Sequence, residues 1–302
     1  MPRIALLIEY AGKKFRGSQY QEGVRTVQQE LEDALGILFK QFTRAHLSGR
    51  TDSGVSARGQ VAHCDVPPLA AMPWLKIGAA ETRFQPAAMK RALAVGKVDG
   101  NASPEPVFDR NALDELAWKI NGIIGRDLSV TSIELVPDDF HARRSAVKRQ
   151  YVYRILNRRQ RSALLEDTYL SVYRPLDLAA MRLAASKLLG SHDFSAFRST
   201  STDRSSPICQ VSRCEILNLR EGELEFWIAA DHFVYNMVRI IVGTLIEVGL
   251  GKRDAESISQ ALERRERNLA GPTAPPWGLT LDSVFYPEAL SLWEQKFQEN
   301  RQ

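Results

Sequence analysis

The sequence predicts an α+β protein built from sandwich-like domains, and three observations indicate this class. The chain has 302 residues, of which 44% are hydrophobic and 25% charged, so it is long enough for two domains with separate cores. Strand-like and helix-like segments are mixed without the regular β-α-β alternation of a doubly wound sheet. The second half also repeats the order of the first in outline. We expect the boundary between the halves near residues 138–147.

The first half begins with a buried strand over residues 3–10. Thr26 and Gln29 then form the capping-box start of a helix. The apolar face of this helix contains Val27, Leu31, Leu35, Leu38 and Phe39. A strand from about residue 55 to 66 follows, and a further strand is expected at 130–136. The helix between these two strands is indicated by Leu113, Leu116, Ala117 and Ile120.

The second half starts with an alternating strand over residues 148–157. Asp177 caps a helix that ends before Gly190, and strands follow at 211–217 and 223–230.

A helix expected from Phe233 to Val248 is apolar on nearly all sides, which is typical of a buried helix. A polar stripe on it contains Tyr235, Asn236, Arg239, Gly243 and Glu247. A guanidinium in such a helix is costly unless it meets a carboxylate. The alternative is an Arg239 side chain that reaches solvent.

Residues 67–107 interrupt the pattern. Prolines occur there at positions 67, 68, 73, 86, 104 and 106. A connection of this length is usually functional or disordered. We expect an insertion-like loop.

Basic residues are concentrated in one segment, although the whole chain carries a net charge of only +4. Eight basic residues and no acidic one lie between positions 143 and 161: Arg143, Arg144, Lys148, Arg149, Arg154, Arg158, Arg159 and Arg161. Tyr151 and Tyr153 lie among them, a pattern typical of contact with looped or single-stranded nucleic acid. The alternative is a solvated strand and loop rich in arginine, and core packing is the expected role of Tyr153.

The cysteines and histidines indicate no disulfide framework and no metal site. The three cysteines, Cys64, Cys209 and Cys214, are an odd number with no framework spacing, and we expect them to be packing residues of a protein from a reducing compartment. The five histidines, at positions 46, 63, 141, 192 and 232, are scattered along the sequence. The apolar run at residues 4–8 is too short for a membrane span, so we expect a cytoplasmic protein.

Asp52 is the residue at which we expect chemistry. It lies in the segment S-G-R-T-D-S-G-V-S-A-R-G over residues 48–59. Gly49 and Gly54 are expected to bend the backbone into a turn that presents Asp52, and Arg50 supplies a nearby positive charge. An ionised carboxylate of this kind suits a nucleophile or an electrostatic stabiliser. The alternative is an ordinary surface turn.

The segment resembles the G-R-T-D-A-G-V-H-A signature of the TruA family of tRNA pseudouridine synthases. Further segments resemble that family in the same order along the chain. They are residues 10–21 (Y-A-G-K-K-F-R-G-S-Q-Y-Q), 26–28 (T-V-Q), 140–143 (F-H-A-R), 148–153 (K-R-Q-Y-V-Y), 192–197 (H-D-F-S-A-F), 237–243 (M-V-R-I-I-V-G) and 274–281 (A-P-P-W-G-L-T-L). The sequence departs from the family pattern at Ser18, Ser53 and Ser56, and at the turn over residues 121–125.

The resemblance implies two ferredoxin-like halves, over residues 1–140 and 141–302, whose antiparallel sheets join around a central cleft. It implies a homodimer that isomerises uridine to pseudouridine in the anticodon stem-loop of tRNA, at tRNA positions 38–40. That reaction gains and loses no atom, so we expect no cofactor and no metal. The alternatives are a tRNA-binding protein without catalysis and a pseudouridine synthase with another RNA target.

The resemblance also implies roles for single residues. Asp52 and Arg239 are the catalytic candidates, with Asp52 attacking C1′ or removing a sugar proton; the sequence leaves both routes open. Tyr151 is expected to stack on the flipped uracil, and Arg50 to be a wedge or phosphate clamp. Contacts to the RNA backbone are expected from Phe15, Arg16, Gly17, Gln19, Arg143, Arg144, Lys148 and Arg149.

Overall fold

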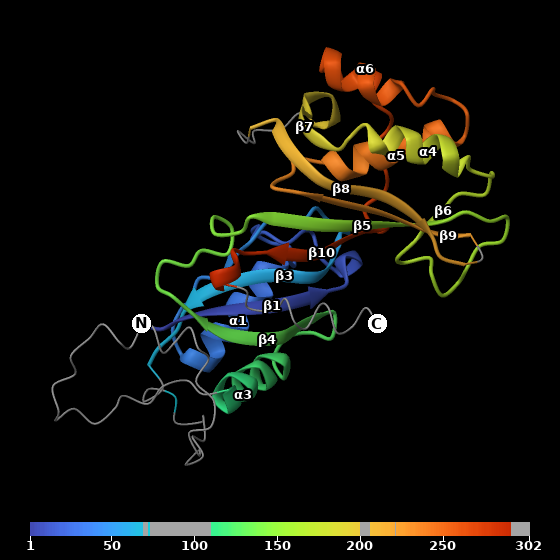
Figure 1. Cartoon of the computed structure of the whole chain (residues 1–302). Helices are drawn as coiled ribbons and strands as arrows, with labels where there is room; N and C mark the ends of the chain where they lie inside the picture. The colour runs from blue at the N-terminus through green and yellow to red at the C-terminus, as the bar shows by residue number, and fades with distance from the viewer. Residues whose placement is uncertain (69–71, 73–109, 200–205, 221, 291–302) are drawn as a thin grey trace.

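The computed structural model of the chain describes residues 1–68, 72, 110–199, 206–220 and 222–290 (Figure 1). The loop expected at residues 67–107 therefore lies almost entirely outside the described residues.

One long, mixed sheet forms the centre of the molecule. Its strands are β1 (Arg3–Tyr10), β2 (His46–Leu47), β3 (Ser56–Asp65), β4 (Leu128–Val136), β5 (Lys148–Leu156), β6 (Leu170–Ser171), β7 (Gly190–Asp193), β8 (Ile208–Asn218), β9 (Glu223–Ala230) and β10 (Leu279–Phe285). The strand order is β4-β1-β3-β10-β5-β9-β8-β7, with β2 paired to β3 and β6 paired to β5. The protein is thus of the α+β class, as the sequence predicts.

The two parts of the sheet meet at β3 and β10. This pair is parallel and short, with Thr280 opposite Ser56 and Leu281 opposite Ala57. On its other side β10 pairs with β5 in antiparallel orientation, from Leu279 opposite Tyr153 to Phe285 opposite Lys148. The last of the described strands therefore lies in the middle of the sheet, beside the strand that follows Asp52.

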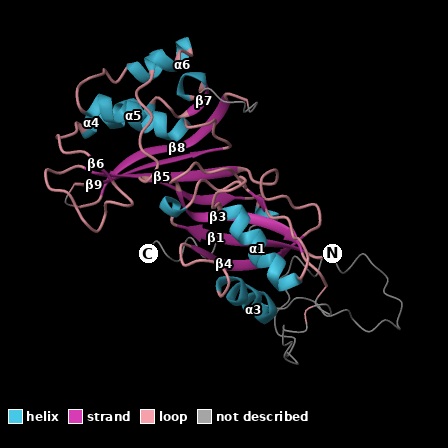
Figure 2. Ribbon diagram, turned by 180° about the vertical axis from the view of Figure 1, so that it is seen from behind, coloured by secondary structure: helices cyan, strands magenta, loops and turns pink. Residues whose placement is uncertain are grey.

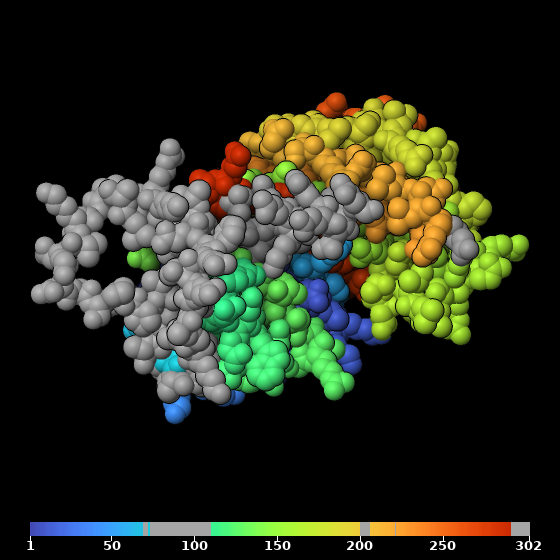
Figure 3. All heavy atoms as spheres, turned by 60° about the horizontal axis from the view of Figure 1, so that its bottom comes forward, coloured from blue at the N-terminus to red at the C-terminus, as the bar shows by residue number. Residues whose placement is uncertain are grey.

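Helices cover the two ends of the sheet separately (Figures 1 and 2). They are α1 (Val27–Phe39), α3 (Arg110–Asn121), α4 (Leu178–Ser186), α5 (Met237–Gly249) and α6 (Ser257–Arg264), with short 3-10 turns at Gly12–Lys14, Ser195–Phe197, Arg267–Leu269 and Glu288–Leu290. The helices α1 and α3 lie near β1 and β4, whereas α4, α5 and α6 gather near β7, β8 and β9. The space-filling view in Figure 3 shows the surface of α3 and β4, in green, well apart from the yellow and orange surface of the second end.

The buried apolar side chains form two clusters. One contains residues of β1, β3, β4, α1 and α3 together with Leu281, Val284 and Tyr286. The other contains residues of β5, β8, β9, α4, α5 and α6 together with Val55 and Leu279. The division of the chain at residues 140 and 141 stays a prediction, and β10 contributes side chains to both clusters.

The start of α1 follows only half of the predicted capping box. The Thr26 hydroxyl accepts a hydrogen bond from the Gln29 backbone N–H at 3.3 Å, as expected. The side-chain Oε1 of Gln29 is buried and has no hydrogen-bond partner. The hydroxyl cap therefore acts together with the Gly17 and Ser18 carbonyls, which accept the N–H groups of Val27 and Gln28.

The helix predicted from Phe233 begins instead at Met237. Asn236 has φ 63° and ψ 7°, a left-handed conformation that no helix continues through. The apolar residues Phe233 and Val234 misled the prediction, because residues 233–236 line a pocket rather than a helix face.

The three cysteines are free thiols. Cys64 and Cys209 are buried and Cys214 is half-buried, which agrees with packing roles. None of the helices described is both long enough and apolar enough to cross a membrane.

Candidate active site

Asp52 lies at the start of a tight turn between β2 and β3. The Val55 N–H donates to the Asp52 carbonyl at 3.1 Å, and Gly54 has φ +84° at the third position of the turn. A positive φ at this position is typical of a type II turn and favours glycine. Gly49, which was also expected to bend the backbone here, does not have a positive φ. The bend that presents Asp52 therefore depends on Gly54.

A buried hydrogen-bond network supports this turn from below. The Thr51 N–H donates to the Ser18 hydroxyl at 2.8 Å, and the Ser18 N–H donates to the Thr51 carbonyl at 3.1 Å. The Thr51 hydroxyl also lies 2.7 Å from the Tyr10 hydroxyl. Burial raises the pKa of Tyr10 to about 12, so this phenol stays neutral. The backbone of residue 51 is thus held on both sides, which fixes the direction of the next side chain.

The buried residues of the segment at residues 10–21 pack against this turn. Gly12 packs so closely on the turn that a Cβ there would lie 2.2 Å from the Val55 carbonyl carbon. Phe15 is only 2% exposed and packs edge-on against Tyr10, with ring centroids 6.0 Å apart. The expectation that Phe15 contacts RNA is therefore wrong for its side chain, because packing buries it. Arg16, Gly17 and Gln19 do line the pocket.

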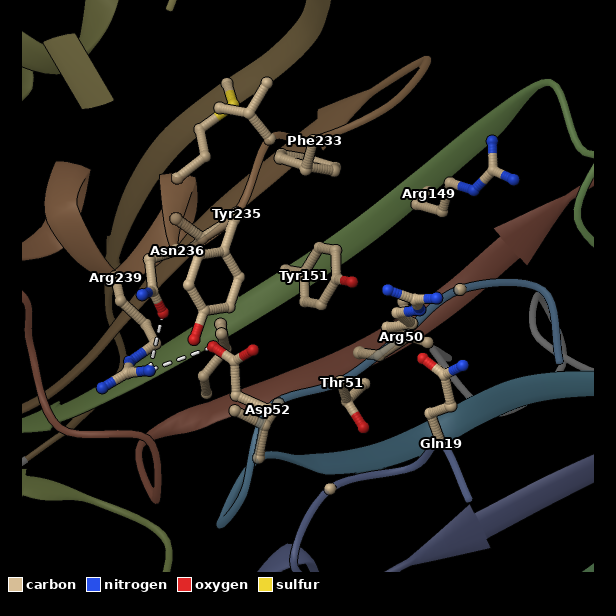
Figure 4. A pocket seen from close by; sticks show the side chains of 18 of the residues that line it. Gln19, Arg50, Thr51, Asp52, Arg149, Tyr151, Phe233, Tyr235, Asn236 and Arg239 are labelled. Atoms are coloured by element: carbon tan, nitrogen blue, oxygen red, sulfur yellow. Dashed lines mark hydrogen bonds and ion pairs between the residues drawn. The ribbon is translucent and has the colours of Figure 1, made fainter. Parts of the chain in front are cut away.

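Asp52 pairs with Arg239 of α5. The Oδ2 atom of Asp52 lies 3.0 Å from a terminal nitrogen of Arg239. The side chain of Asp52 is 26% exposed and that of Arg239 is 17% exposed. The pairing expected from the apolar helix is present, and Figure 4 shows the two side chains meeting beside the ring of Tyr235. The sequence prediction had Arg50 as the neighbouring charge, but Arg50 is exposed and lies on the other side of Tyr151 in this view.

The backbone of residues 271–274 crosses α5 and fixes the arginine. The Nε of Arg239 donates to the Ala274 carbonyl at 2.8 Å, and the Ala274 N–H donates to the Arg239 carbonyl at 3.0 Å. Gly243 allows this crossing, since a Cβ there would lie 1.8 Å from the Pro272 carbonyl oxygen. Gly243 of the polar stripe therefore helps to hold the Arg239 side chain, whereas Glu247 of the same stripe pairs with Arg253.

A cavity of about 1020 Å³ opens above this ion pair. Tyr151 of β5 lies in it between Asp52 and Arg149 (Figure 4), and Phe233 packs edge-on against its ring with centroids 5.0 Å apart. Burial raises the pKa of Tyr151 well above its usual range, so its hydroxyl is a neutral donor at physiological pH. Such a pocket offers a planar ring, a carboxyl group and a guanidinium to a base and its sugar.

Tyr153, two residues along the same strand, has the packing role that the sequence indicates. It is fully buried, and its hydroxyl donates to the Pro275 carbonyl at 2.8 Å.

Arg143, Arg144 and Arg149 line the opposite end of the cavity, and the first two are exposed. Lys148 does not line the cavity. It belongs to the other face of β5, and its ammonium lies 4.1 Å from the centroid of the Phe285 ring. Its predicted contact with RNA therefore has no support from the pocket.

Arg149 binds backbone rather than a carboxylate. Its two terminal nitrogens donate to the carbonyl oxygens of Ala146, Asp231, Ser48 and Arg143, at 3.2, 2.8, 3.3 and 2.6 Å. These four bonds occupy every N–H of the two terminal groups. Burial lowers the pKa of Arg149 from 12.5, but the side chain stays charged. Arg149 therefore joins three segments around the pocket and contributes charge, while its terminal N–H groups are already engaged.

Three of the histidines that are scattered in sequence lie together behind this basic end. The ring of His63 lies 5.0 Å from that of His46 and 4.6 Å from that of His141. Burial, together with the charges of the other two histidines, lowers the pKa of His63 to about 4. The pairing of β2 with β3 places His46 opposite His63, a long-range register that spacing does not reveal.

These histidines support the basic loop. His63 accepts the Ala142 N–H at 3.1 Å, and His141 accepts those of Arg143 at 3.2 Å and Arg144 at 3.5 Å. Within the described residues, no group of three His, Cys, Asp or Glu side chains is arranged to hold a metal ion.

The pocket residues that sequence reasoning missed include Phe233, Tyr235 and Asn236, which were assigned to a helix face. The available signal was Asn236 itself, a residue type that favours turns and tolerates left-handed backbone.

Comparison with known proteins gives a consistent result. A tRNA pseudouridine synthase family profile matches residues 184–287. The chain is 37% identical to a tRNA pseudouridine synthase A of Rhodopseudomonas palustris over 95% of this chain and the full length of that relative. It is 38% identical to one of Methylobacterium nodulans, with 96% of this chain and 98% of the relative covered. A third, from Myxococcus xanthus, is 35% identical, with coverage of 95% and 92%.

Proposed function

The chain belongs to the tRNA pseudouridine synthase A family, and on that basis we propose that it isomerises uridine to pseudouridine in the anticodon stem-loop of tRNA. The observation that supports this most directly is the Asp52–Arg239 ion pair beside Tyr151 in the cavity. A single carboxylate next to an aromatic ring is what the reaction needs.

The reaction moves one glycosidic bond. The bond between C1′ and N1 of uridine breaks, the base turns over, and C5 bonds to C1′. The proton on C5 then leaves, and N1 ends with a proton, so no atom is gained or lost. This chemistry needs no redox cofactor and no metal.

Asp52 carries the chemical step in this proposal. Its carboxylate either attacks C1′ or removes a proton from the sugar, and the geometry is compatible with both routes. Arg239 holds the carboxylate in place through the ion pair and directs it into the cavity. Because the pair is partly exposed, a ribose can approach the free oxygen of Asp52 without breaking the ion pair.

Tyr151 receives the base. Its ring lies beside the carboxylate, and Phe233 restricts its rotation. Since its phenol is neutral, the hydroxyl can donate a hydrogen bond to the uracil or guide the departing C5 proton. Arg50, which is exposed at the pocket, is suited to fill the gap left by a flipped nucleotide.

The basic end of the cavity binds the RNA backbone. Arg16, Gln19, Arg143 and Arg144 line it and are exposed, so phosphates can reach them. We further propose that the protein acts in the cytoplasm as a homodimer, in keeping with a tRNA substrate and with the family resemblance.

The test is tritium release from tRNA transcripts labelled at C5 of uridine. We expect the parent protein to release tritium and Asp52→Asn to release none above background while it binds the transcript with parental affinity. Asp33→Asn, an exposed acid of α1, is the matched control and should retain activity. A parent that binds tRNA without release is an RNA-binding protein, and activity of Asp52→Asn would exclude the mechanism.

Mapping of pseudouridine in total RNA from a deletion strain tests the target. Loss of modification confined to the anticodon stem-loop supports the proposal. Loss at another RNA site would identify a synthase with a different target.

A further inference from the structure

Asn236 has an unusual conformation for its place in the chain. It is the residue before α5, and such residues normally have extended backbone and a side chain that caps the helix. Here φ is 63° and the side chain makes no capping hydrogen bond. The other non-glycine residues with positive φ in the described part of the chain, Lys40 and Arg265, follow helices, where this conformation is common.

The side chain of Asn236 folds back onto Arg239 instead. Its Oδ1 accepts a hydrogen bond from a terminal nitrogen of Arg239 at 2.7 Å, and the same nitrogen donates to Asp52 Oδ2 at 3.0 Å (Figure 4). The amide nitrogen of Asn236 donates to the Ser199 hydroxyl at 3.0 Å. Because a guanidinium can only donate, the bond to Arg239 fixes which end of the amide faces the arginine, and the Ser199 hydroxyl accepts from the other end.

Three acceptors therefore hold the guanidinium of Arg239. Two of them, the Asn236 amide and the Ala274 carbonyl, are neutral, and only Asp52 is charged. The other titratable groups near the pair are Tyr151 and Tyr153 of β5, Tyr235 of the loop and, farther off, Arg50. No second carboxylate competes for the guanidinium within the described residues.

We propose that Asn236 is a positioning residue that holds Arg239 against Asp52 and does so as a neutral acceptor. A left-handed backbone is required so that the amide reaches across the first turn of α5, three residues ahead. The strained position and the missing helix cap have the same explanation, since the side chain serves the ion pair instead of the helix. The catalytic part of this inference rests on the proposed function.

Two substitutions separate this role from a role in folding. Asn236→Gly keeps the left-handed backbone and removes the amide. We expect kcat for tritium release to fall about 100-fold, with little change in KM for the transcript or in melting temperature. Lys40→Gly is the control. It also places a glycine at a left-handed position, which is exposed, and it should leave kcat at the parental value.

Asn236→Asp keeps the shape and adds a charge. The carboxylates at positions 52 and 236 then share one guanidinium nitrogen. Because the two negative charges repel each other, one of them takes up a proton at a higher pH than the single carboxylate of the parent does. We expect the acidic limb of the kcat–pH profile to move up by about one pH unit. An effect on folding alone would lower kcat at every pH without moving this limb.

If the parent is active, two results overturn the inference and leave the proposed function intact. One is a parental kcat in Asn236→Gly, and the other is an unchanged acidic limb of the kcat–pH profile in Asn236→Asp. An inactive parent defeats the proposed function instead. Denaturant unfolding then tests the positioning role. A double-mutant cycle of Asp52→Asn and Arg239→Leu gives the coupling free energy of the pair, and it is measured once in the parent and once in the Asn236→Gly variant. A coupling that shrinks in the Asn236→Gly background supports the inference, and an equal coupling overturns it.

Discussion

The two ends of the cavity each hold a half-buried arginine, but the two side chains have different partners. At the acidic end Arg239 faces the Asp52 carboxylate. At the basic end Arg149 donates to four backbone carbonyls and pairs with no carboxylate in the described part of the chain. The charge of the first guanidinium is balanced within the protein, whereas that of the second remains to attract an anion.

This difference indicates that the two arginines have different roles. Arg239 adds a local interaction to one acid, so its loss should affect turnover. Arg149 joins the loops that carry Ser48, Arg143 and Asp231, so its loss should affect the framework of the site. Four substitutions or conditions test whether the two ends are as separate as their contacts suggest.

The largest effect is expected at the acidic end. Arg239→Leu removes the only cation seen in contact with Asp52 in the described residues, and kcat should fall by about 100- to 1000-fold. Affinity for tRNA should remain near the parental value, because the phosphate-facing residues are untouched. Single-turnover tritium release with a filter-binding assay measures both. Full turnover in this variant would show that the pairing is not needed for chemistry.

The next largest effect is expected from Arg149. Arg149→Met leaves four carbonyls without their donor, and the free energy of unfolding should fall by about 3 kcal/mol. Arg149→Lys keeps the charge but loses the planar fork, so it should recover only part of that stability. Urea unfolding measures the change. If Arg149→Met loses turnover without losing stability, the proposed contrast with Arg239 is wrong.

A smaller effect should follow from acidification, through His63 at the basic end. Its pKa in the folded protein is about 4, below the usual 6.5, so between these values the unfolded chain binds the extra proton. Stability should therefore fall as the pH drops from 7 to 5, with a contribution from His63 of about 2 kcal/mol. Urea unfolding of the parent and of His63→Gln at both pH values isolates this part. An equal pH dependence in the variant would assign the loss to other groups.

The smallest effect is expected from the exposed arginines. Arg143→Gln and Arg144→Gln should each weaken tRNA binding several-fold and reduce the slope of log affinity against log salt by about one. Arg264→Gln, on the exposed side of α6, is the control and should change neither quantity. Unchanged slopes in all three variants would move the RNA away from this end of the cavity.

Much of the acidic end could be predicted from the sequence because its signals are local or energetic. The Asp52 turn requires glycine at one position, and an arginine in an apolar helix requires an acidic partner, which restricts the choice. Strands and helices with clear periodicity were also predicted within a few residues of their observed bounds.

The rest depends on long-range contacts that periodicity does not encode. The same alternation of side chains predicts β5 but not that Lys148 and Arg149 belong to opposite faces, one beside Phe285 and one in the cavity. The histidine group requires the pairing of β2 with β3 and the path of residues 140–144. Phe233 and Tyr235 were misassigned because an aromatic residue has the same sequence signal in a core, on a helix face and in a pocket wall. The RNA contact of Phe15 was implied by the family resemblance, which does not show that its side chain is buried.

The position of β10 between β3 and β5 has a consequence for how the chain folds during its synthesis. More than two hundred residues separate Asp65 from Leu279, so a ribosome makes the edge next to Asp52 long before its neighbour exists. Until that late segment docks, the strands on both sides have open edges, which are prone to mispairing with other chains. Of the described strands, the one beside the Asp52 turn is therefore the last to be synthesised. Drugs or mutations that delay the docking of β10 would produce aggregated protein rather than a folded enzyme with slow turnover.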